Sequence, residues 1–331
     1  MDSTETSQTP GHQARSVGWI GLGSMGLAMA VNIQKHLVAT GAPNLHYWNR
    51  TISKGQELAE LGGIACENVA DVPRSCAITF ISVSDDQTLQ SIVNEISTLG
   101  PLLEDKILVD TTTVHPSTTT SISTHLTSLG AVYIAAPVFG STPVARAGQL
   151  LVAVAGDDEA IITISPLLQG VIARGVLRAG PDPAQALLLK TTSNMLTAGL
   201  TYLISEAHVL AEKTGLPSTV LESLIEQNLG SYAHGVSKRL TGGAYLPAAG
   251  VAPQSSLALG IKDVQHGVEL ASGVGMGLDV AGKYVGAARE AREWGEQRGR
   301  GLDSSAVYGV LRVRAGLGFE NGVVRERDGG E

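Results

Sequence analysis

The chain has 331 residues, of which 43% are apolar and 16% charged, and its formal net charge is −8. This length predicts two domains, and the apolar content is sufficient for sizeable cores, which excludes global disorder. The acidic balance argues against nucleic acid as a partner, because binding to a phosphate backbone requires a basic surface.

The amino-terminal residues and the cysteines bear on where the protein works. Residues 1–16 are polar and lack the apolar stretch of a signal peptide, so we expect a short disordered arm there. No apolar run approaches the length of a membrane span. The two cysteines, Cys66 and Cys76, match neither a disulfide framework nor a metal-binding spacing. The sequence therefore predicts a cytoplasmic protein with reduced cysteines, no metal site and no membrane partner.

A glycine-rich turn lies between an apolar run at 17–20 and a helical pattern at 27–38. Its residues are Gly21, Leu22, Gly23, Ser24, Met25 and Gly26. A strand that leads through GxGxxG into a helix is the context of a dinucleotide-binding site. The first glycine permits the tight turn, the second lets the backbone approach a pyrophosphate, and the third lets helix and strand pack closely. We therefore predict that these six residues bind the cofactor at the helix amino terminus.

The residues after the second predicted strand, 45–48, indicate which dinucleotide is bound. An Asp or Glu there would bind the ribose 2′-hydroxyl of NAD. The chain has instead Asn49, Arg50 and Thr51, followed by Lys54. These four side chains are able to bind a 2′-phosphate, and no carboxylate is present to repel it. We therefore predict NADP(H) as the cofactor. The alternative is that Arg50 and Lys54 are only the solvated start of a helix.

Four further strands are predicted in the first half, over 77–83, 107–110, 132–134 and 151–155, and we expect the last of these to end the sheet. Their β-branched runs are typical of a buried parallel sheet. Ligands of such sheets bind at the carboxyl ends of the strands. We therefore expect Val83 and Ser84, and also the hydroxyl-rich turn 111–117, to lie at the cofactor edge. The alternative role of that turn is helix capping.

The pattern changes near residues 180–183, where the β-branched runs cease and helical segments follow. The predicted fold is α/β: a Rossmann-type doubly wound sheet over 17–183, followed by an all-α domain over 184–320 for substrate binding and dimerisation. Residues 321–331 are expected to form a frayed tail. The first helix of the second half, 184–214, is apolar on several faces, which suggests burial between domains or subunits and hence a homodimer or a tetramer.

Two lysines lie inside otherwise apolar helical segments of the second half. Lys190 and Asn194 are four residues apart, which places both side chains on one face of a helix. Lys262 lies in a second such segment. A lysine in an apolar stretch is costly unless it has a partner or a purpose. The alternative for Lys190 is a side chain that reaches solvent near the helix start.

Five blocks in this order resemble the β-hydroxyacid dehydrogenase family, which includes 3-hydroxyisobutyrate dehydrogenases and glyoxylate/succinic semialdehyde reductases. The resemblance covers nearly the whole chain, from about residue 17 to about residue 319. The blocks read IGLGSMGLAMAVNI, DTTTVHPST, APVFGSTPVARAGQLLVAVAGD, KTTSN and IKD. The NRT sequence at 49–51 resembles the NADP(H)-using branch of the family.

The resemblance implies roles for particular side chains. Lys190 would be the catalytic lysine, with Asn194 as its companion at the substrate. Thr113 and Lys262 would contact the cofactor. A positioned ammonium stabilises a developing alkoxide and donates the proton, while the nicotinamide supplies the hydride. We therefore predict an NADPH-dependent oxidoreductase that interconverts a small aldehyde or keto compound and its hydroxy form, with Lys190 as general acid.

The substrate-loop block departs from the family's pattern. The resemblance implies that Gly140 and Ser141 line the substrate site, but Phe139 stands where many members have a serine that helps to bind the substrate carboxylate. A phenyl ring makes no such hydrogen bond. The substrate is therefore expected to be larger or less polar than a small hydroxy acid, unless Ser141 takes over part of the role.

Two other functions are compatible with the same frame. One is imine reduction, which Phe139 favours slightly because an imine pocket needs an apolar lining. Lys190 counts against it, because the related imine reductases usually lack this lysine. The other is a non-enzymatic NADP-binding module, against which the retention of Lys190, Asn194 and Lys262 argues.

Overall fold

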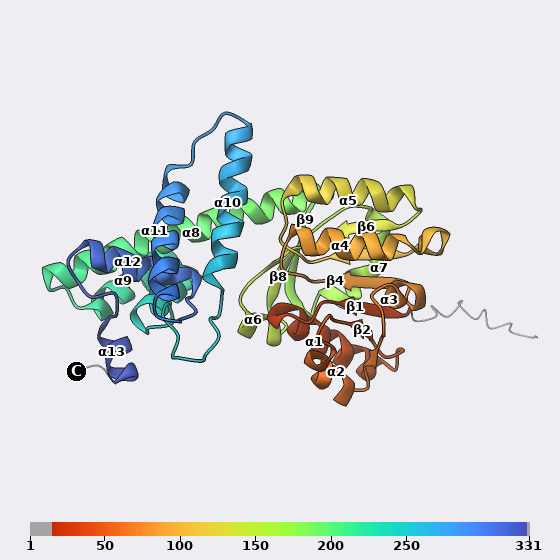
Figure 1. Cartoon of the computed structure of the whole chain (residues 1–331), viewed down its shortest axis with the longest axis horizontal. Coiled ribbons are helices and arrows are strands. Elements are labelled where there is room, and N and C mark those ends of the chain that lie inside the picture. The colour runs from red at the N-terminus through yellow and green to blue at the C-terminus, as the bar shows by residue number, and fades with distance from the viewer. Residues whose placement is uncertain (1–14, 330–331) are drawn as a thin grey trace, which may run out of the picture. The chain divides into compact units, whose positions relative to one another are not determined.

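The computed structural model describes residues 15–329, which form two compact units (Figure 1). The first unit comprises the chain up to Thr112 together with Ser117–Gly140 and Val144–Ala184. The second unit comprises the chain from Gln185 onward and two short segments of the first half, Thr113–Pro116 and Ser141–Pro143. Several residues of the predicted substrate loop and cofactor turn therefore belong to the helical unit.

The amino-terminal arm predicted over 1–16 lies almost wholly outside the described residues. Its last residue, Ser16, is part of the fold. The carbonyl oxygen of Ser16 accepts hydrogen bonds from the amides of Ala77 and Ile78, which extends the hydrogen bonding of the sheet by one residue. The prediction of disorder is therefore wrong for Ser16.

The first unit is built on a sheet whose strands follow the order β3-β2-β1-β4-β5-β6-β8-β7, with β9 also paired to β8. Strands β1 to β6 are parallel, and β8 runs antiparallel to β6 and β7. The order 3-2-1-4-5-6 is that of dinucleotide-binding sheets, so the predicted doubly wound fold is confirmed. The strands are β1 Val17–Ile20, β2 His46–Trp48, β3 Ile64–Ala65, β4 Ile78–Ile81, β5 Ile107–Asp110, β6 Val132–Ala135, β7 Val138–Phe139, β8 Leu150–Ala155 and β9 Ala173–Gly180.

Strand β9 corrects the prediction that 151–155 ends the sheet. It follows the last helix of the first unit and pairs in parallel with β8. Its sequence, ARGVLRAG, contains two arginines, and most of its residues are partly or fully exposed. A half-exposed strand lacks the continuous apolar run that marks a buried parallel strand, and for that reason the sequence pattern did not reveal it.

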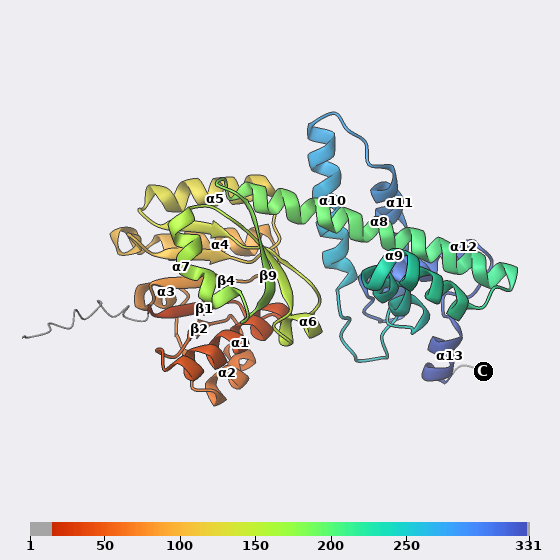
Figure 2. The same cartoon turned by 180° about the vertical axis from the view of Figure 1, so that it is seen from behind.

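Helices cover both faces of the sheet. Figures 1 and 2, which view the chain from opposite sides, show α4 and α5 on one side and α7 on the other. The amino termini of α4 and α7 are capped by Asp85 and Asp157, whose side chains accept hydrogen bonds from the amides of Thr88 and Ala160. The helices of the first half are α1 Ser24–Thr40, α2 Gln56–Glu60, α3 Asp71–Ser75, α4 Asp86–Ser97, α5 Pro116–Ser128, α6 Thr142–Arg146 and α7 Asp158–Leu168, with 3-10 turns η1 Ile52–Gly55 and η2 Gly100–Leu103.

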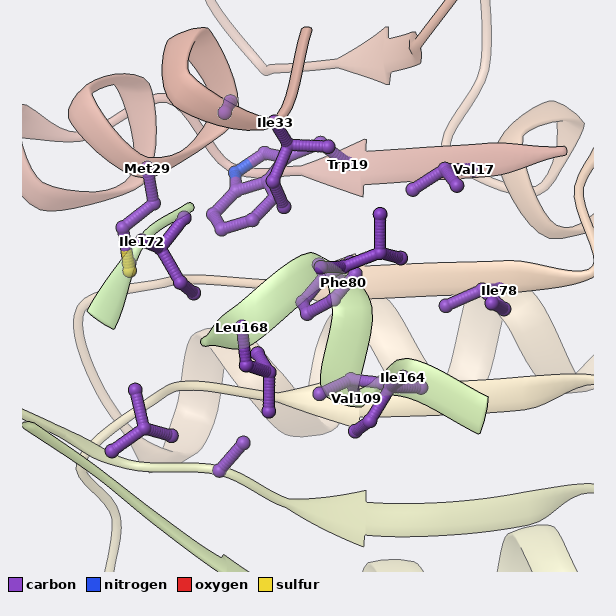
Figure 3. Close-up of a cluster of buried hydrophobic side chains, with 14 of the residues drawn as sticks. Val17, Trp19, Met29, Ile33, Ile78, Phe80, Val109, Ile164, Leu168 and Ile172 are labelled. Carbon is purple, nitrogen blue, oxygen red and sulfur yellow. The ribbon is translucent and has the colours of Figure 1, made fainter. Parts of the chain in front are cut away.

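One face of the sheet carries the largely aliphatic core drawn in Figure 3. Trp19 of β1 and Phe80 of β4 are fully buried, and their rings stack with centroids 5.3 Å apart. Because Val109 of β5 is in register with Phe80, its side chain belongs to the same layer. The residues that cover this layer are Met29 and Ile33 from α1 and Ile164 and Leu168 from α7. Burial of these side chains holds α1 on the sheet and so fixes the position of its amino terminus.

The second unit is all-helical in the described residues. Its core includes the aromatic rings of Tyr245, Tyr308 and Phe319, and the first two meet edge to face at 5.1 Å. Within α9, Gly230 departs from helical geometry at φ 82°, which bends the helix. None of the described helices is both long and apolar enough to cross a membrane. The helices are α8 Ala184–Thr214, α9 Ser218–Thr241, α10 Leu257–Gly273, α11 Asp279–Glu296, α12 Val307–Arg314 and α13 Gly322–Asp328, with the 3-10 turn η3 Ser304–Ala306.

The carboxyl-terminal segment corrects the prediction of a frayed tail over 321–331. Asn321 caps α13 by accepting a hydrogen bond from the amide of Val324, and its side-chain amide donates to the carbonyl oxygens of Leu240 and Thr241. Val324 is fully buried. These contacts reach residues about 80 positions earlier, so the local composition gave no sign of them. Residues 330–331 lie outside the described part of the chain.

Candidate functional site

The glycine turn has the geometry that its sequence predicts. Gly21 has φ +96°, and a Cβ atom there would overlap the carbonyl oxygen of Ser82. A Cβ atom at Gly26 would overlap the carbonyl oxygen of Gly21. Gly23 differs, because nothing lies within 4 Å of the place that its Cβ would take. Gly23 is also the N-cap of α1 and makes no side-chain cap, so the amino terminus of α1 adjoins this open space. This cradle fits a pyrophosphate.

The other residues of the turn divide between core and surface. Leu22 is buried, and its backbone amide donates to Oδ1 of Asn49 at 2.9 Å. The side-chain amide of Asn49 in turn donates to the carbonyl oxygen of Thr51 at 2.7 Å. Asn49 therefore ties the end of β2 to the glycine turn. Ser24 is exposed at the start of α1, and Met25 is half-buried against the core.

The segment after β2 presents an exposed basic surface. Arg50, Thr51 and Lys54 are all exposed, and Lys54 lies in η1. The first acidic side chain after them, Glu57, accepts two hydrogen bonds from the guanidinium of Arg146 at 2.6 and 2.7 Å. Because this carboxylate is already paired, it offers little repulsion to an anionic group beside Arg50.

The ends of β4 and β5 are joined by hydrogen bonds. The amide of Val83 donates to Oγ1 of Thr112 at 3.2 Å, and the hydroxyl of Ser84 donates to Asp85 at 2.5 Å. Val83 also borders the glycine turn, since its side chain lies 3.1 Å from the place of a Cβ on Gly21. Val83 is thus placed beside the cradle, whereas the hydroxyl of Ser84 is engaged with the cap of α4.

Asp110, at the end of β5, is fully buried and begins the DTTTVHPST block. Its carboxylate accepts hydrogen bonds from the hydroxyl of Tyr133 at 2.7 Å and from the amide of Thr112 at 2.9 Å. Burial raises the pKa of Asp110 to about 6, although both hydrogen bonds act in the opposite direction. Asp110 therefore fixes the start of the turn that carries Thr112.

The predicted catalytic residues lie in the second unit, in a polar set that centres on Asp263 of α10. The side-chain amide of Asn194 donates to Oδ2 of Asp263 at 3.1 Å. The ammonium of Lys262 lies 3.1 Å from Oδ1 of the same carboxylate and donates to the carbonyl oxygen of Thr113 at 2.5 Å. Asn194, Lys262 and Thr113 are thus brought together: Asp263 contacts Asn194 and Lys262, and Lys262 contacts Thr113.

Lys190 lies one turn before Asn194 on α8 and is half-buried. Burial lowers the pKa of Lys190, and the positive charge of Lys262 lowers it further, whereas the negative charge of Asp263 raises it. The balance is a lowered pKa, which suits a group that gives up a proton during a reaction.

Close packing of α8 and α10 supports this polar set. A Cβ atom at Gly267 of α10 would overlap the sulfur of Met195 and would lie 3.4 Å from the methyl group of Thr191, both on α8. Glycine therefore lets the two helices approach at the level where Asn194 meets Asp263. The sequence gave no signal for this contact, because the partners are about 70 residues apart.

The predicted substrate loop follows β7. Phe139 is half-buried and pairs with Leu151 of β8. Gly140 has φ +141°, and a Cβ atom there would lie 2.7 Å from the side chain of Leu150, so the position favours glycine. Ser141 is half-buried and belongs to the second unit. Farther along, the side-chain amide of Asn32 on α1 donates to the carbonyl oxygen of Ala145 at 2.8 Å, which anchors the end of the loop.

The predicted residues thus divide between the two units. The glycine turn, the basic segment, the end of β4, Phe139 and Gly140 belong to the first. Ser141 and the lysine set, which is Lys190, Asn194, Lys262 and Asp263 with Thr113, belong to the second. Among residues 15–329, no group of three His, Cys, Asp or Glu side chains is placed to hold a metal ion. The fold and the cradle at α1 define the class of the protein: a dinucleotide-binding α/β protein with a helical second unit.

Comparisons with known proteins narrow this class. Residues 16–180 match the family described as the NAD binding domain of 6-phosphogluconate dehydrogenase. Glyoxylate/succinic semialdehyde reductase 1 of Arabidopsis thaliana is 31% identical over 306 residues, which covers 89% of this chain and 98% of that protein. NADH-dependent oxidoreductase ucdB of Aspergillus ustus is 29% identical over 301 residues, again with 89% and 98% coverage. A solved structure of Mycobacterium tuberculosis 3-hydroxyisobutyrate dehydrogenase has a TM-score of 0.76 at 20% identity, covering 90% of this chain and 99% of that one.

The chain belongs to the β-hydroxyacid dehydrogenase family. It is an NAD(P)-dependent dehydrogenase or reductase that acts on CH–OH or C=O groups, as the sequence predicted. The predicted family and enzyme class are therefore confirmed.

Two glycine substitutions test the cradle. Gly23→Ala places a methyl group in open space at the head of α1, so we expect unchanged stability but at least tenfold weaker dinucleotide binding, measured by fluorescence titration. Gly26→Ala forces a methyl group against a backbone oxygen, so we expect a loss of about 1–3 kcal/mol in the free energy of unfolding, measured by urea denaturation. Equal dinucleotide affinity in Gly23→Ala and the parent would contradict the placement of the pyrophosphate.

Proposed function

We propose that this protein is an NADPH-dependent reductase of a small aldehyde or keto compound, able to run in reverse as a dehydrogenase of the hydroxy form. The observation that carries the proposal is Lys190, a half-buried lysine of lowered pKa, one helical turn from Asn194 in a set held by Asp263. The relatives named as reductases of glyoxylate, succinic semialdehyde and 2-hydroxy-3-oxopropionate support the reaction class.

The residues of the second unit supply the acid–base part of the reaction. When bound, the reduced nicotinamide supplies the hydride. The ammonium of Lys190 stabilises the negative charge that develops on the carbonyl oxygen and donates its proton there. Asn194 orients the substrate from the same helix face, and Asp263 holds Asn194 and Lys262 in place. In the reverse direction, neutral Lys190 accepts the hydroxyl proton.

Imine reduction is the weaker candidate for the same frame. Phe139 is compatible with an apolar imine, but Lys190 and Asn194 on one face of α8 offer the proton donor that carbonyl reduction needs. A panel of cyclic imines in the same assay, with oxidation of the dinucleotide as the readout, separates the two reactions.

The preference for NADPH is the second part of the proposal. Arg50 and Lys54 are exposed after β2, and the first carboxylate that follows them is paired with Arg146. A guanidinium binds a phosphate through charge-assisted hydrogen bonds. The relative from Aspergillus ustus is named as NADH-dependent, so similarity to relatives does not by itself assign NADPH. The proposed preference for NADPH therefore depends on the residues that follow β2.

Replacement of Lys190 tests the acid. We expect Lys190→Ala to lower kcat for carbonyl reduction by about 10²–10⁴-fold with little change in dinucleotide affinity, whereas Lys213→Ala, near the other end of the same helix, retains the parent rate. Because reduction needs the ammonium form of Lys190, kcat should fall as pH rises, and this fall should occur at a pH below the ordinary pKa of lysine. Asp263→Asn should move the fall to a still lower pH, since Asp263 raises the pKa of Lys190. Full turnover in Lys190→Ala would refute the assignment.

Replacement of Arg50 tests cofactor choice. Arg50→Ala should lower kcat/KM with NADPH by about 10–100-fold, the effect of losing a charge-assisted hydrogen bond, and should leave kcat/KM with NADH nearly unchanged. Arg74→Ala on α3 is the matched control, because Arg74 is another exposed arginine of the first unit. Comparable efficiency of the parent with both dinucleotides would refute the role of Arg50.

We further propose that the chain forms a homodimer through α8. Four leucines recur every seven residues along this helix and are exposed by 38%, 72%, 56% and 65%. Leucines repeated every seven residues lie on one face of a helix, as in helices that pack against a partner helix. Soluble monomers rarely expose a row of large apolar side chains along one helix. These leucines are Leu189, Leu196, Leu203 and Leu210.

The mass of the protein in solution tests the dimer. The parent should elute at twice the chain mass of 34.3 kDa in size-exclusion chromatography with light scattering. The double variant Leu203→Glu, Leu210→Glu should elute as a monomer, whereas Ile162→Glu on α7, where the isoleucine is 70% exposed, should not change the mass. A monomeric parent would refute the dimer, and a fourfold mass would show a tetramer.

A further inference from the structure

Two histidines that the proposed chemistry does not use lie together in the second unit. The imidazole rings of His115 and His266 have centroids 5.6 Å apart and stand perpendicular to each other. Both residues are half-buried. They come from segments that are about 150 residues apart in sequence, so only the fold brings them together.

The pair adjoins the lysine set along two segments of the chain. His266 lies four residues after Lys262 and three after Asp263 on α10, which places all three side chains on one face of that helix. His115 lies two residues after Thr113, whose carbonyl oxygen is held by the ammonium of Lys262 at 2.5 Å. The same lysine thus fixes the segment that carries one histidine and stands one helical turn from the other.

The charges of this set favour an anion. Lys190 and Lys262 are its two lysines, and Asp263 is its one carboxylate. That carboxylate already accepts from Asn194 and faces Lys262. An imidazole donates a hydrogen bond when neutral and donates from both nitrogens when protonated. Two imidazoles beside an excess of positive charge therefore suit a carboxylate of the ligand better than they suit an apolar group.

We propose that His115 and His266 bind a carboxylate of the substrate and so select oxo acids over neutral aldehydes. This inference rests on the proposed function, since it names the substrate class of the same reaction. The phenyl ring of Phe139 offers no hydrogen bond to a carboxylate. In this proposal the imidazoles of His115 and His266 supply the hydrogen-bond donors instead. The two histidines act in specificity, and Lys190 remains the acid.

Kinetics with two substrates of equal chain length test the pair. The probes are succinic semialdehyde and its methyl ester, which differ only in the charge of the far end. In the double variant His115→Gln, His266→Gln we expect KM for the acid to rise by about 10–100-fold, the loss of charge-assisted hydrogen bonds, with kcat changed less than about threefold. KM for the ester should stay within about twofold of the parent value. The control is His125→Gln, on an exposed position of α5.

Binding without turnover supplies a second readout. Butyrate and butyramide are titrated by calorimetry into the NADP⁺-loaded parent and double variant. Butyrate should bind the parent about tenfold or more tightly than it binds the variant, and butyramide should bind both equally.

The outcomes separate the two proposals. Equal losses on acid and ester, or equal butyrate binding by parent and variant, would overturn the role of the histidines while leaving carbonyl reduction intact. If the parent reduces neither probe nor any other carbonyl, the proposed function fails, and the butyrate titration still decides whether the pair binds a carboxylate.

Discussion

The absence of a Cβ atom at a few positions sets the geometry on which the functional residues depend. In the first unit, Gly21 and Gly26 bring β1, the end of β4 and α1 so close that a methyl group would overlap a backbone carbonyl oxygen. Backbone atoms in a sheet and a helix have little room to move aside, so this constraint is strict. It fixes the position of the first turn of α1 and thus of the helix amino terminus.

In the second unit a glycine also permits close packing, but the constraint is less strict. Gly267 lets α10 approach α8, but the atom that a Cβ would meet belongs to the side chain of Met195. Methionine has three rotatable bonds and adapts more easily than a backbone carbonyl. The approach nevertheless matters for chemistry, because it lies beside the hydrogen bond between Asn194 and Asp263. Helix packing and the polar set therefore support each other.

Asp110, which is buried, and Lys190, which is half-buried, show how neighbouring groups modify the effect of burial on a pKa. For Asp110, desolvation and the negative charge of Asp86 outweigh the hydrogen bonds from Thr112 and Tyr133, so its pKa rises to about 6. For Lys190, desolvation and Lys262 both disfavour the charged form, and Asp263 offsets them in part. In both cases the neutral form is more favoured than it is for the same group in water. Asp110 holds the turn after β5 through its hydrogen bonds, whereas in the proposed reaction the lowered pKa of Lys190 helps it to release a proton.

Much of the fold and part of the site follow from the sequence by itself. The glycine turn, the parallel strands of apolar residues, the helix over 184–214 and the shared face of Lys190 and Asn194 all depend on residues within a few positions of one another. Local backbone sterics and side-chain periodicity determine such features. The family resemblance rests on the same short blocks.

The tertiary structure alone decided how these blocks combine. Lys262 meets the carbonyl oxygen of Thr113 across 149 residues, and Asn194 meets Asp263 across 69. The half-exposed strand β9, the packed segment from Asn321 and the pair of histidines likewise depend on distant partners. Local composition carries no record of such contacts, because the free energy that stabilises them is gained only when separate elements pack together.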